Sequence, residues 1–124
     1  MPEDPISMEP ERLDRGRARF QEVMGWDFPP STEPFAEQGV LGTVFAELWT
    51  RPGLADRDRR WISITCVCLA GKEGPMRQHM EAALASGDIS LEEMTEFVLH
   101  FAFYAGWPNA STAHQVLREL AASL

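Results

Sequence analysis

The fold class of this chain is decided by the stretch Trp61-Ile62-Ser63-Ile64-Thr65-Cys66-Val67-Cys68-Leu69. Its β-branched and aromatic residues favour a strand by propensity alone. The other apolar segments of the chain have helical spacing, so a strand here would find no second strand with which to pair. Because a lone strand leaves its backbone polar groups unsatisfied, we predict a buried helix over about residues 57–70 and an all-α fold.

Outward from this helix, apolar residues recur at helical spacing and turn residues separate the periodic segments. We therefore predict a six-helix bundle, with the other five helices at about residues 10–24, 33–49, 76–86, 90–104 and 109–122. Residues 1–10 contain three prolines and no periodicity, and we expect them to form a tail. We expect residues 11–124 to form a single domain.

Helix ends are marked by capping and breaking residues. Ser90 and Glu93 have the spacing of a capping box, which predicts that a helix starts at this point. Asp56 is a suitable N-cap for the helix over residues 57–70. Gly74 and Pro75 are expected to separate that helix from the next one.

The chain is acidic, with 11 Lys and Arg against 19 Asp and Glu and a formal net charge of −8. Nucleic acids and anionic membranes are bound through clustered Lys and Arg, so we expect neither as a partner. No window approaches the roughly 18 apolar residues of a membrane-spanning helix. The acidic, proline-broken start is unlike a secretory signal, so we expect a cytoplasmic protein. Residues 101–124 carry one acid and one base, which indicates core, or core shared with a neighbouring subunit.

The two cysteines, Cys66 and Cys68, are separated by one residue. On a helix this spacing points the two side chains to nearly opposite faces, and a disulfide between them would be strained. We expect both thiols to be reduced. The spacings of the Cys, His and carboxylate residues match neither a zinc site nor a di-iron site, so no metal is expected.

Side chains suited to acid–base chemistry share one face of the predicted helix over residues 90–104. Glu96, His100 and Tyr104 are spaced four residues apart, and the apolar residues form a different face. Two interpretations stay open: His100 is a general acid or base assisted by Glu96, or it is a structural histidine beside a hydrogen-bonded tyrosine. His79, at the start of another predicted helix, has the same two interpretations.

Four arginines cluster around the start of the helix over residues 57–70, namely Arg51, Arg57, Arg59 and Arg60. One interpretation is a solvated turn in which they pair with Asp56 and Asp58. The other is a clamp for a carboxylate ligand, because guanidinium groups bind planar anions in bidentate fashion. The sequence leaves both open.

Several ordered motifs together resemble the carboxymuconolactone decarboxylase family over about residues 41–120. The first is Leu48-Trp49-Thr50-Arg51-Pro52-Gly53-Leu54, followed by Arg57-Asp58-Arg59. The second combines His79, Ala83-Leu84 and Gly87 with Ser90 and Glu92-Glu93. The third runs through His100, Ala102, Tyr104-Ala105-Gly106-Trp107-Pro108 and Ala110.

The resemblance implies an all-helical domain of the alkylhydroperoxidase-D-like superfamily that self-associates as trimers or hexamers. It also implies a lyase of aromatic catabolism, which removes CO2 from a small carboxylated lactone without a cofactor. His79 is then the first choice for the acid that protonates the resulting dienolate, and His100 and Tyr104 would orient or assist. Arg51 or Arg59 would hold a carboxylate of the substrate, and Trp107 is the remaining candidate for a substrate-binding residue.

Two departures from the family's patterns define the alternatives. Peroxidases of the superfamily use a C-x-x-C motif upstream of a histidine, and alignment on His79 places Lys72 and Pro75 at the two cysteine positions. The absence of this dithiol argues against a thiol peroxidase. Arg60 stands where many relatives have a glutamate. A catalytically degenerate, oligomeric helical binding protein is therefore the alternative to an enzyme.

Overall fold

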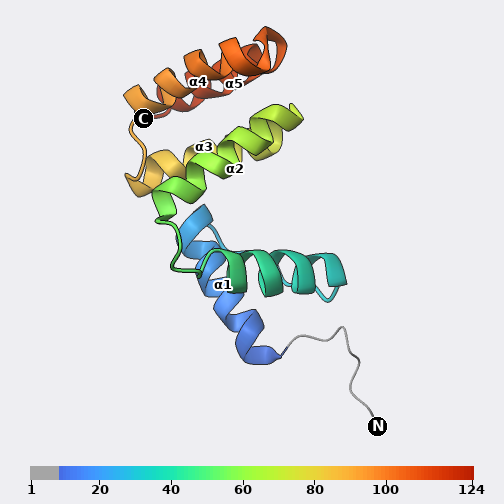
Figure 1. Ribbon diagram of the computed structural model, residues 1–124. Helices are drawn as coiled ribbons and strands as arrows, with labels where there is room; N and C mark the ends of the chain where they lie inside the picture. Colours follow the sequence, from blue (N-terminus) through green and yellow to red (C-terminus); the bar gives the residue numbers. More distant parts are fainter. Residues whose placement is uncertain (1–8) are drawn as a thin grey trace. The chain divides into compact units, whose positions relative to one another are not determined.

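The computed structural model describes residues 9–124, which form six helices and, within that range, no strand (Figure 1). The all-α prediction is confirmed for this part of the chain. The helices are α1 (Pro10–Met24), η1 (Phe35–Leu48), α2 (Asp56–Ala70), α3 (Glu73–Ser86), α4 (Leu91–Ala105) and α5 (Trp107–Ala122). The tail predicted for residues 1–10 lies outside the described residues, except for its last two positions.

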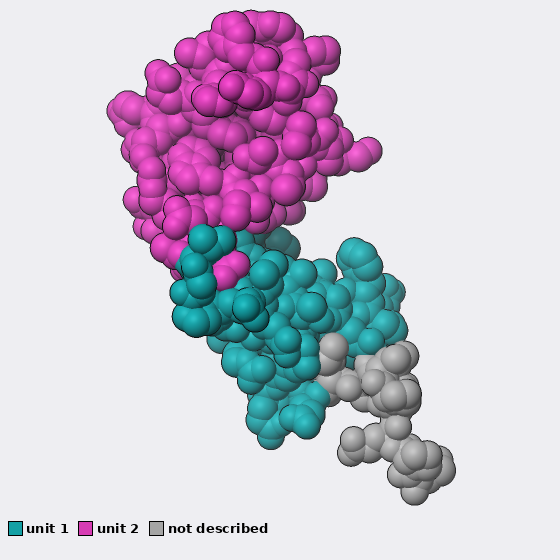
Figure 2. Space-filling model, in the orientation of Figure 1, with its two compact units in different colours: residues 1–54 teal, residues 55–124 magenta. Residues whose placement is uncertain are grey.

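The chain divides into two compact units, residues 1–54 and residues 55–124, which Figure 2 distinguishes by colour. The expectation of a single domain over residues 11–124 stays a prediction.

Unit 1 consists of α1 packed against η1. Its apolar core is rich in aromatic side chains: Phe20 packs edge-on against Phe45 at 4.8 Å between ring centroids, and Phe45 stacks on Trp49 at 6.2 Å. Polar side chains of α1 also contribute to the packing of unit 1. Arg12 donates to the Gly42 carbonyl at 2.6 Å, and other arginines of α1 likewise donate to backbone carbonyls. Hydrogen bonds from its arginines therefore hold the polar face of α1 against the rest of unit 1.

The helix over Phe35–Leu48 has π-type geometry, with hydrogen bonds between residues five apart. The Trp49 N–H donates to the Val44 carbonyl at 3.0 Å, and the Thr43 hydroxyl donates to the Gln38 carbonyl at 2.6 Å. Apolar spacing predicts a helix here, and a helix is present. It does not predict this geometry, which is rare in proteins over more than one turn.

Unit 2 contains α2 to α5. The helix pair α4 and α5 packs side by side, as does the pair α2 and α3, and α3 and α2 also contact α5 (Figure 1). The core is formed by the apolar faces of all four helices, with fully buried Ile64 from α2, Met76 and Met80 from α3, Met94 from α4 and Val116 from α5. The strand-like stretch of the sequence is thus a helix whose apolar face is buried against three others.

The capping box at the start of α4 is confirmed. The Ser90 hydroxyl accepts from the Glu93 N–H at 3.1 Å, and the Ser90 N–H donates to the Glu93 carboxylate at 3.0 Å. The helix ends at Ala105 and is followed by Gly106, whose φ of +100° favours glycine. Helix α5 follows at once, with Pro108 in its first turn, where a missing N–H carries no penalty.

Two predicted helix boundaries are wrong. Asp56 is the first residue of α2 and not its N-cap, which is Ala55 without a side-chain cap. Helix α3 begins at Glu73, so Gly74 and Pro75 lie within its first turn instead of separating two helices. Proline is tolerated there because its fixed φ is helical and the first N–H groups of a helix have no intrahelical acceptor.

None of the helices formed by residues 9–124 is long and apolar enough to cross a lipid bilayer.

Candidate functional site

Helix α4 has two faces, as its sequence predicts. Met94 and Val98 are buried in the core of unit 2, whereas Glu96, His100 and Tyr104 are exposed. The rings of His100 and Tyr104 stack with their centroids 5.0 Å apart and an angle of 12° between their planes. The structure therefore brings two of the predicted site residues together on one surface.

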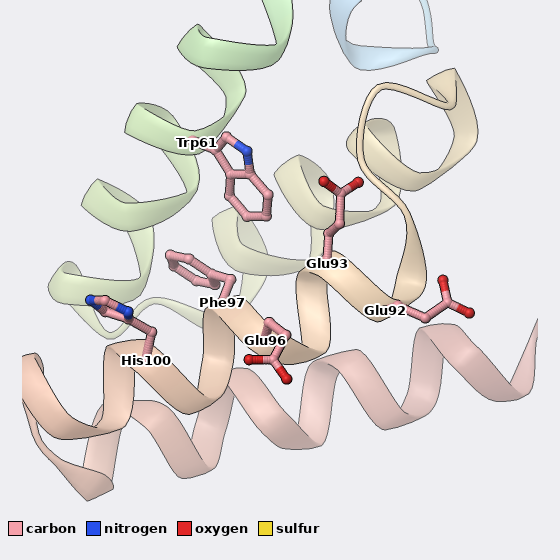
Figure 3. A pocket seen from close by; sticks show the side chains of 6 residues that line it. All are labelled: Trp61, Glu92, Glu93, Glu96, Phe97 and His100. Atoms are coloured by element: carbon pink, nitrogen blue, oxygen red, sulfur yellow. The ribbon is translucent and has the colours of Figure 1, made fainter.

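The face of α4 that carries His100 borders a solvent-open cavity of about 500 Å³, which we call cavity A. Its lining residues are Trp61 from α2 and Glu92, Glu93, Glu96, Phe97 and His100 from α4. The Trp61 and Phe97 rings face each other at 5.4 Å between centroids, with His100 to one side and the carboxylate of Glu93 to the other (Figure 3). Cavity A thus has an aromatic wall and a carboxylate rim.

The three carboxylates of cavity A differ in how they are compensated. Glu93 accepts two hydrogen bonds from the Arg57 guanidinium, which also lies 5.8 Å from the centre of the Trp61 ring. The hydrogen bonds from Arg57 and from the Ser90 backbone lower the pKa of Glu93 to about 2. Within residues 9–124, Glu92 and Glu96 have no hydrogen bond or ion pair from their side chains. The rim therefore keeps two uncompensated negative charges.

On the other side of His100 lies cavity B, of about 450 Å³. Its lining residues are Thr65 and Leu69 from α2 and Phe97, His100, Phe101, Tyr104 and Ala105 from α4. Among these described residues there is no Asp, Glu, Lys or Arg. The Thr65 hydroxyl donates to the Trp61 carbonyl at 2.7 Å, so its oxygen is left as an acceptor. Cavity B is therefore mainly apolar, and its polar groups are a histidine, a tyrosine and a threonine.

A third cavity, cavity C, of about 370 Å³, lies between α4 and α5. It is lined by Trp107, His114 and seven further residues, among them Glu96. Trp107, a predicted substrate-binding residue, therefore borders cavity C and neither of the cavities next to His100.

His79, the predicted acid, lies half-buried on α3 and lines none of cavities A, B and C. Burial, and next the positive charge of Arg60, lower the pKa of His79. Arg60 is buried on α2 and donates from Nε to the Asp88 carboxylate at 2.8 Å. The His79 imidazole is thus mostly neutral at pH 7, and none of cavities A, B and C is lined by both His79 and His100.

The remaining predicted site residues, Arg51 and Arg59, line none of cavities A, B and C. Arg59 is buried on α2, and Arg51 is exposed after the end of η1, in the other unit. Their proposed role in carboxylate binding stays a prediction.

Two arginines of the predicted cluster form ion pairs with residues distant in sequence. Arg57 pairs with Glu93 at the start of α4, and Arg60 pairs with Asp88 in the loop before α4. The cluster thus includes partners other than Asp56 and Asp58.

Sequence reasoning missed the contribution of α2 to these cavities. Trp61, Thr65 and Leu69 are four residues apart, so they share one face of α2, and that face lines cavities A and B. The spacing was visible in the sequence. What the sequence did not reveal was that this face lies opposite Phe97 and His100.

The two cysteines are free, as predicted, with Cys66 exposed and Cys68 buried. Burial raises the pKa of the Cys68 thiol to about 11, so this thiol is not a reactive thiolate at neutral pH. Within residues 9–124, no three His, Cys, Asp or Glu side chains come together in an arrangement that would hold a metal ion.

Comparison with known proteins identifies the family to which the chain belongs. A sequence model of the Carboxymuconolactone decarboxylase family matches residues 34–119, more than half of the chain. The chain is also 31% identical over 77 residues to a protein of Acinetobacter baylyi named 4-carboxymuconolactone decarboxylase. That match covers 62% of this chain and 57% of the relative, so the chain spans little more than half of the relative's length. No solved structure matches the chain. The chain belongs to the carboxymuconolactone decarboxylase family.

Proposed function

We propose that this chain is a cofactor-independent carboxy-lyase that releases CO2 from a small carboxylated lactone or a related metabolite. The observation that carries the proposal is the pair His100 and Tyr104, stacked at the edge of the apolar cavity B. The name of the Acinetobacter baylyi relative supports the same class of reaction. The substrate of that relative is one candidate within the proposed class.

Cavity B suits the step in which CO2 departs. Its walls are largely apolar, with Leu69, Phe101 and Ala105 among the lining residues. A carboxylate against such walls loses part of its hydration, whereas the CO2 that leaves is neutral. The electron pair of the broken C–C bond passes into the conjugated lactone carbonyl and forms a dienolate. The apolar lining therefore disfavours the reactant carboxylate more than the delocalised product anion.

His100 is the proton donor in this proposal. As an imidazolium it gives its proton to the carbon of the dienolate and regains one from water, so the net change is a carboxylate plus a proton giving CO2 and a C–H bond. The stacked Tyr104 ring holds the imidazole, and its hydroxyl, which has no hydrogen-bond partner within residues 9–124, donates to a lactone oxygen. The two residues thus supply the acid and one positioned hydrogen-bond donor.

His79 was the first choice for the acid on the basis of the sequence, and that assignment stays a prediction. Because the pKa of His79 is lowered, little of its imidazole is protonated at pH 7. The exposed His100 borders two cavities and is better situated to meet a substrate. Comparison of the variants His79→Ala and His100→Ala decides between the two histidines. Replacement of the one that is the acid should abolish CO2 release, and replacement of the other should not.

The test of the proposed function is CO2 release from a panel of carboxylated lactones, one of them 4-carboxymuconolactone, by the purified full-length chain. The carboxyl carbon is labelled with ¹³C, and the gas is analysed by mass spectrometry. We expect labelled CO2 above the spontaneous rate with at least one lactone. A folded protein that releases no CO2 from any of them contradicts the proposal.

The alternative is a helical binding protein that has lost catalysis. Arg60 favours it: the resemblance implies a glutamate at this position, whereas the buried arginine of this chain forms an ion pair with Asp88. Binding of the lactones without CO2 release would support this alternative.

We also propose that the chain self-associates through the exposed face of α4 and α5. Residues 97–117 contain no Asp, Glu, Lys or Arg, and Phe103 and Trp107 are 72% and 59% exposed. Because the chain carries a net charge of −8, copies of it associate with least repulsion where their charge-free surfaces meet. Sedimentation should show a trimer or hexamer that Phe103→Glu dissociates. The matched control Phe35→Glu, at an 81% exposed position of η1, should not change the sedimentation. A monomeric chain contradicts this proposal.

A further inference from the structure

Cavity B is open to water beside Tyr104. The Tyr104 side chain is 86% exposed, although its ring stacks on His100 and lines the cavity. Leu69, on the α2 side of the same cavity, is more than half exposed as well. The proposed decarboxylation depends on apolar walls that remove water from the departing carboxylate. A single copy of the chain therefore leaves the site without a wall on the side of Tyr104.

The exposed apolar surface continues from the mouth of cavity B along α4. Phe103 is adjacent to Tyr104 in the chain, and Leu99 lies one turn before Phe103. The Phe103 ring packs edge-on against Trp107 of α5, with 5.7 Å between the ring centroids. Together with Leu69 and Tyr104, these side chains expose roughly 600 Å², at about 200 Å² for each complete side chain. This patch alone supplies most of the area that a stable interface buries on each partner, about 800 Å².

Charge favours a second copy of this chain as the partner that covers the patch. All residues that line cavity B, and the rest of the patch, belong to residues 61–71 and 97–117. These two segments contain no Asp, Glu, Lys or Arg, whereas the whole chain has a net charge of −8. A strongly charged partner gains no attraction from such a surface, and two copies of an acidic chain avoid their mutual repulsion there.

We infer that a second copy of the chain packs over this patch, closes the mouth of cavity B and supplies the wall that the site lacks. The inference rests on the proposed function and on the proposed self-association. It adds that the site is complete only in the assembly, because the mouth of cavity B and the association surface are continuous through Tyr104 and Phe103.

The test uses Tyr104 as a probe, because it is the only tyrosine of the chain and nitration of tyrosine reports on this position alone. The full-length chain is treated with tetranitromethane at pH 8, at concentrations where sedimentation shows it to be assembled and where it shows it to be dissociated. Nitrotyrosine is measured by peptide mass spectrometry. We expect nitration to be about tenfold slower in the assembled chain, because the reagent then reaches the ring only when the interface opens.

Two variants extend this comparison. Phe103→Glu, whose fold is checked by circular dichroism, should be nitrated at the rate of the dissociated chain at every concentration. The matched control Phe35→Glu should be protected in the same way as the assembled wild-type chain. A second readout is CO2 release per subunit, from a lactone that the wild-type chain decarboxylates. Dissociation should lower this rate by about tenfold, because water then competes at the departing carboxylate.

The outcomes separate this inference from the proposed function. Equal nitration of the assembled and dissociated chains overturns the inference, and so does protection that persists after dissociation, since the cover then belongs to the same chain. A chain that stays monomeric at every concentration also overturns it. Full CO2 release by the dissociated chain overturns the inference and leaves the proposed decarboxylation standing. If the wild-type chain releases no CO2, the proposed function fails, and the nitration rates still decide whether a second copy covers cavity B.

Discussion

Replacement of Gly16 by alanine should destabilise unit 1 more than its small size suggests. Gly16 is buried in the middle of α1, where η1 passes directly over it. An added Cβ would lie 2.1 Å from the carbonyl oxygen of Leu41 and 2.7 Å from its carbonyl carbon. These are backbone atoms of a helix, so no side-chain rotation relieves the clash. The two helices must move apart by roughly 1 Å at this point, a gap that forfeits up to about half of each dispersion contact across it.

The expected loss of stability is about 3 kcal/mol, at the upper end of the range for overpacked cores. Alanine favours a helix over glycine by about 1 kcal/mol, which offsets part of the clash and is included in this figure. For a chain of this length the loss corresponds to a decrease in Tm of roughly 10 °C. The matched control is Gly39→Ala in η1, where an added Cβ meets nothing within 4 Å. That variant should gain up to about 1 kcal/mol.

The assay is thermal unfolding of the two variants and the wild-type chain, followed by circular dichroism. A Gly16→Ala variant that melts at or above the wild-type temperature refutes the close approach of α1 to η1. A loss of equal size in Gly39→Ala would show that the effect belongs to glycine replacement in general.

Two further predictions concern charge and thiol reactivity. The pKa of Glu93 is lowered to about 2 by hydrogen bonds from Arg57 and Ser90, so the stability it contributes is complete above the ordinary carboxyl range and is lost as the pH falls towards 2. Acid unfolding of Arg57→Met should therefore be less steep below pH 4.5 than that of the wild-type chain, and an identical profile would contradict the pairing. Iodoacetamide at pH 8 should modify the exposed Cys66 and spare Cys68, whose pKa is raised to about 11, as peptide mass spectrometry would show. Equal labelling of both thiols in the folded chain would contradict the burial of Cys68.

The local elements of the fold were predictable from the sequence where a short-range signal was strong. Ser90 and Glu93 are three residues apart, and their reciprocal hydrogen bonds form as the capping box predicts. The failures at Asp56 and at Gly74-Pro75 have a common physical cause. Polar and proline residues are tolerated both just before a helix and in its first turn, so their presence does not determine which of the two applies.

Long-range features were not predictable in this way. The π-type geometry of η1 differs from an α-helix by one residue in its hydrogen-bond spacing, and apolar periodicity does not resolve that difference. The contact of Gly16 with Leu41 depends on how two helices pack. No pattern in a single sequence gives that contact.

In the candidate site, too, local features were predictable from the sequence and long-range contacts were not. Helical spacing placed His100 and Tyr104 on one face of α4, and the structure confirms that they share it. The aromatic wall from Trp61 and the compensation of Glu93 by Arg57 required the packing of α2 beside α4. His79 lines none of the three cavities, and its assignment as the acid stays a prediction.

We propose that His100 on α4 is the proton donor of a cofactor-independent decarboxylation. The most direct measurement is the rate of CO2 release by His100→Gln, compared with the wild-type chain and with His114→Gln, which removes a histidine from cavity C. Loss of a positioned general acid lowers a rate by roughly 100- to 10,000-fold. We predict a loss of this size in His100→Gln and a wild-type rate in His114→Gln. A wild-type rate in a folded His100→Gln variant would exclude His100 as the proton donor.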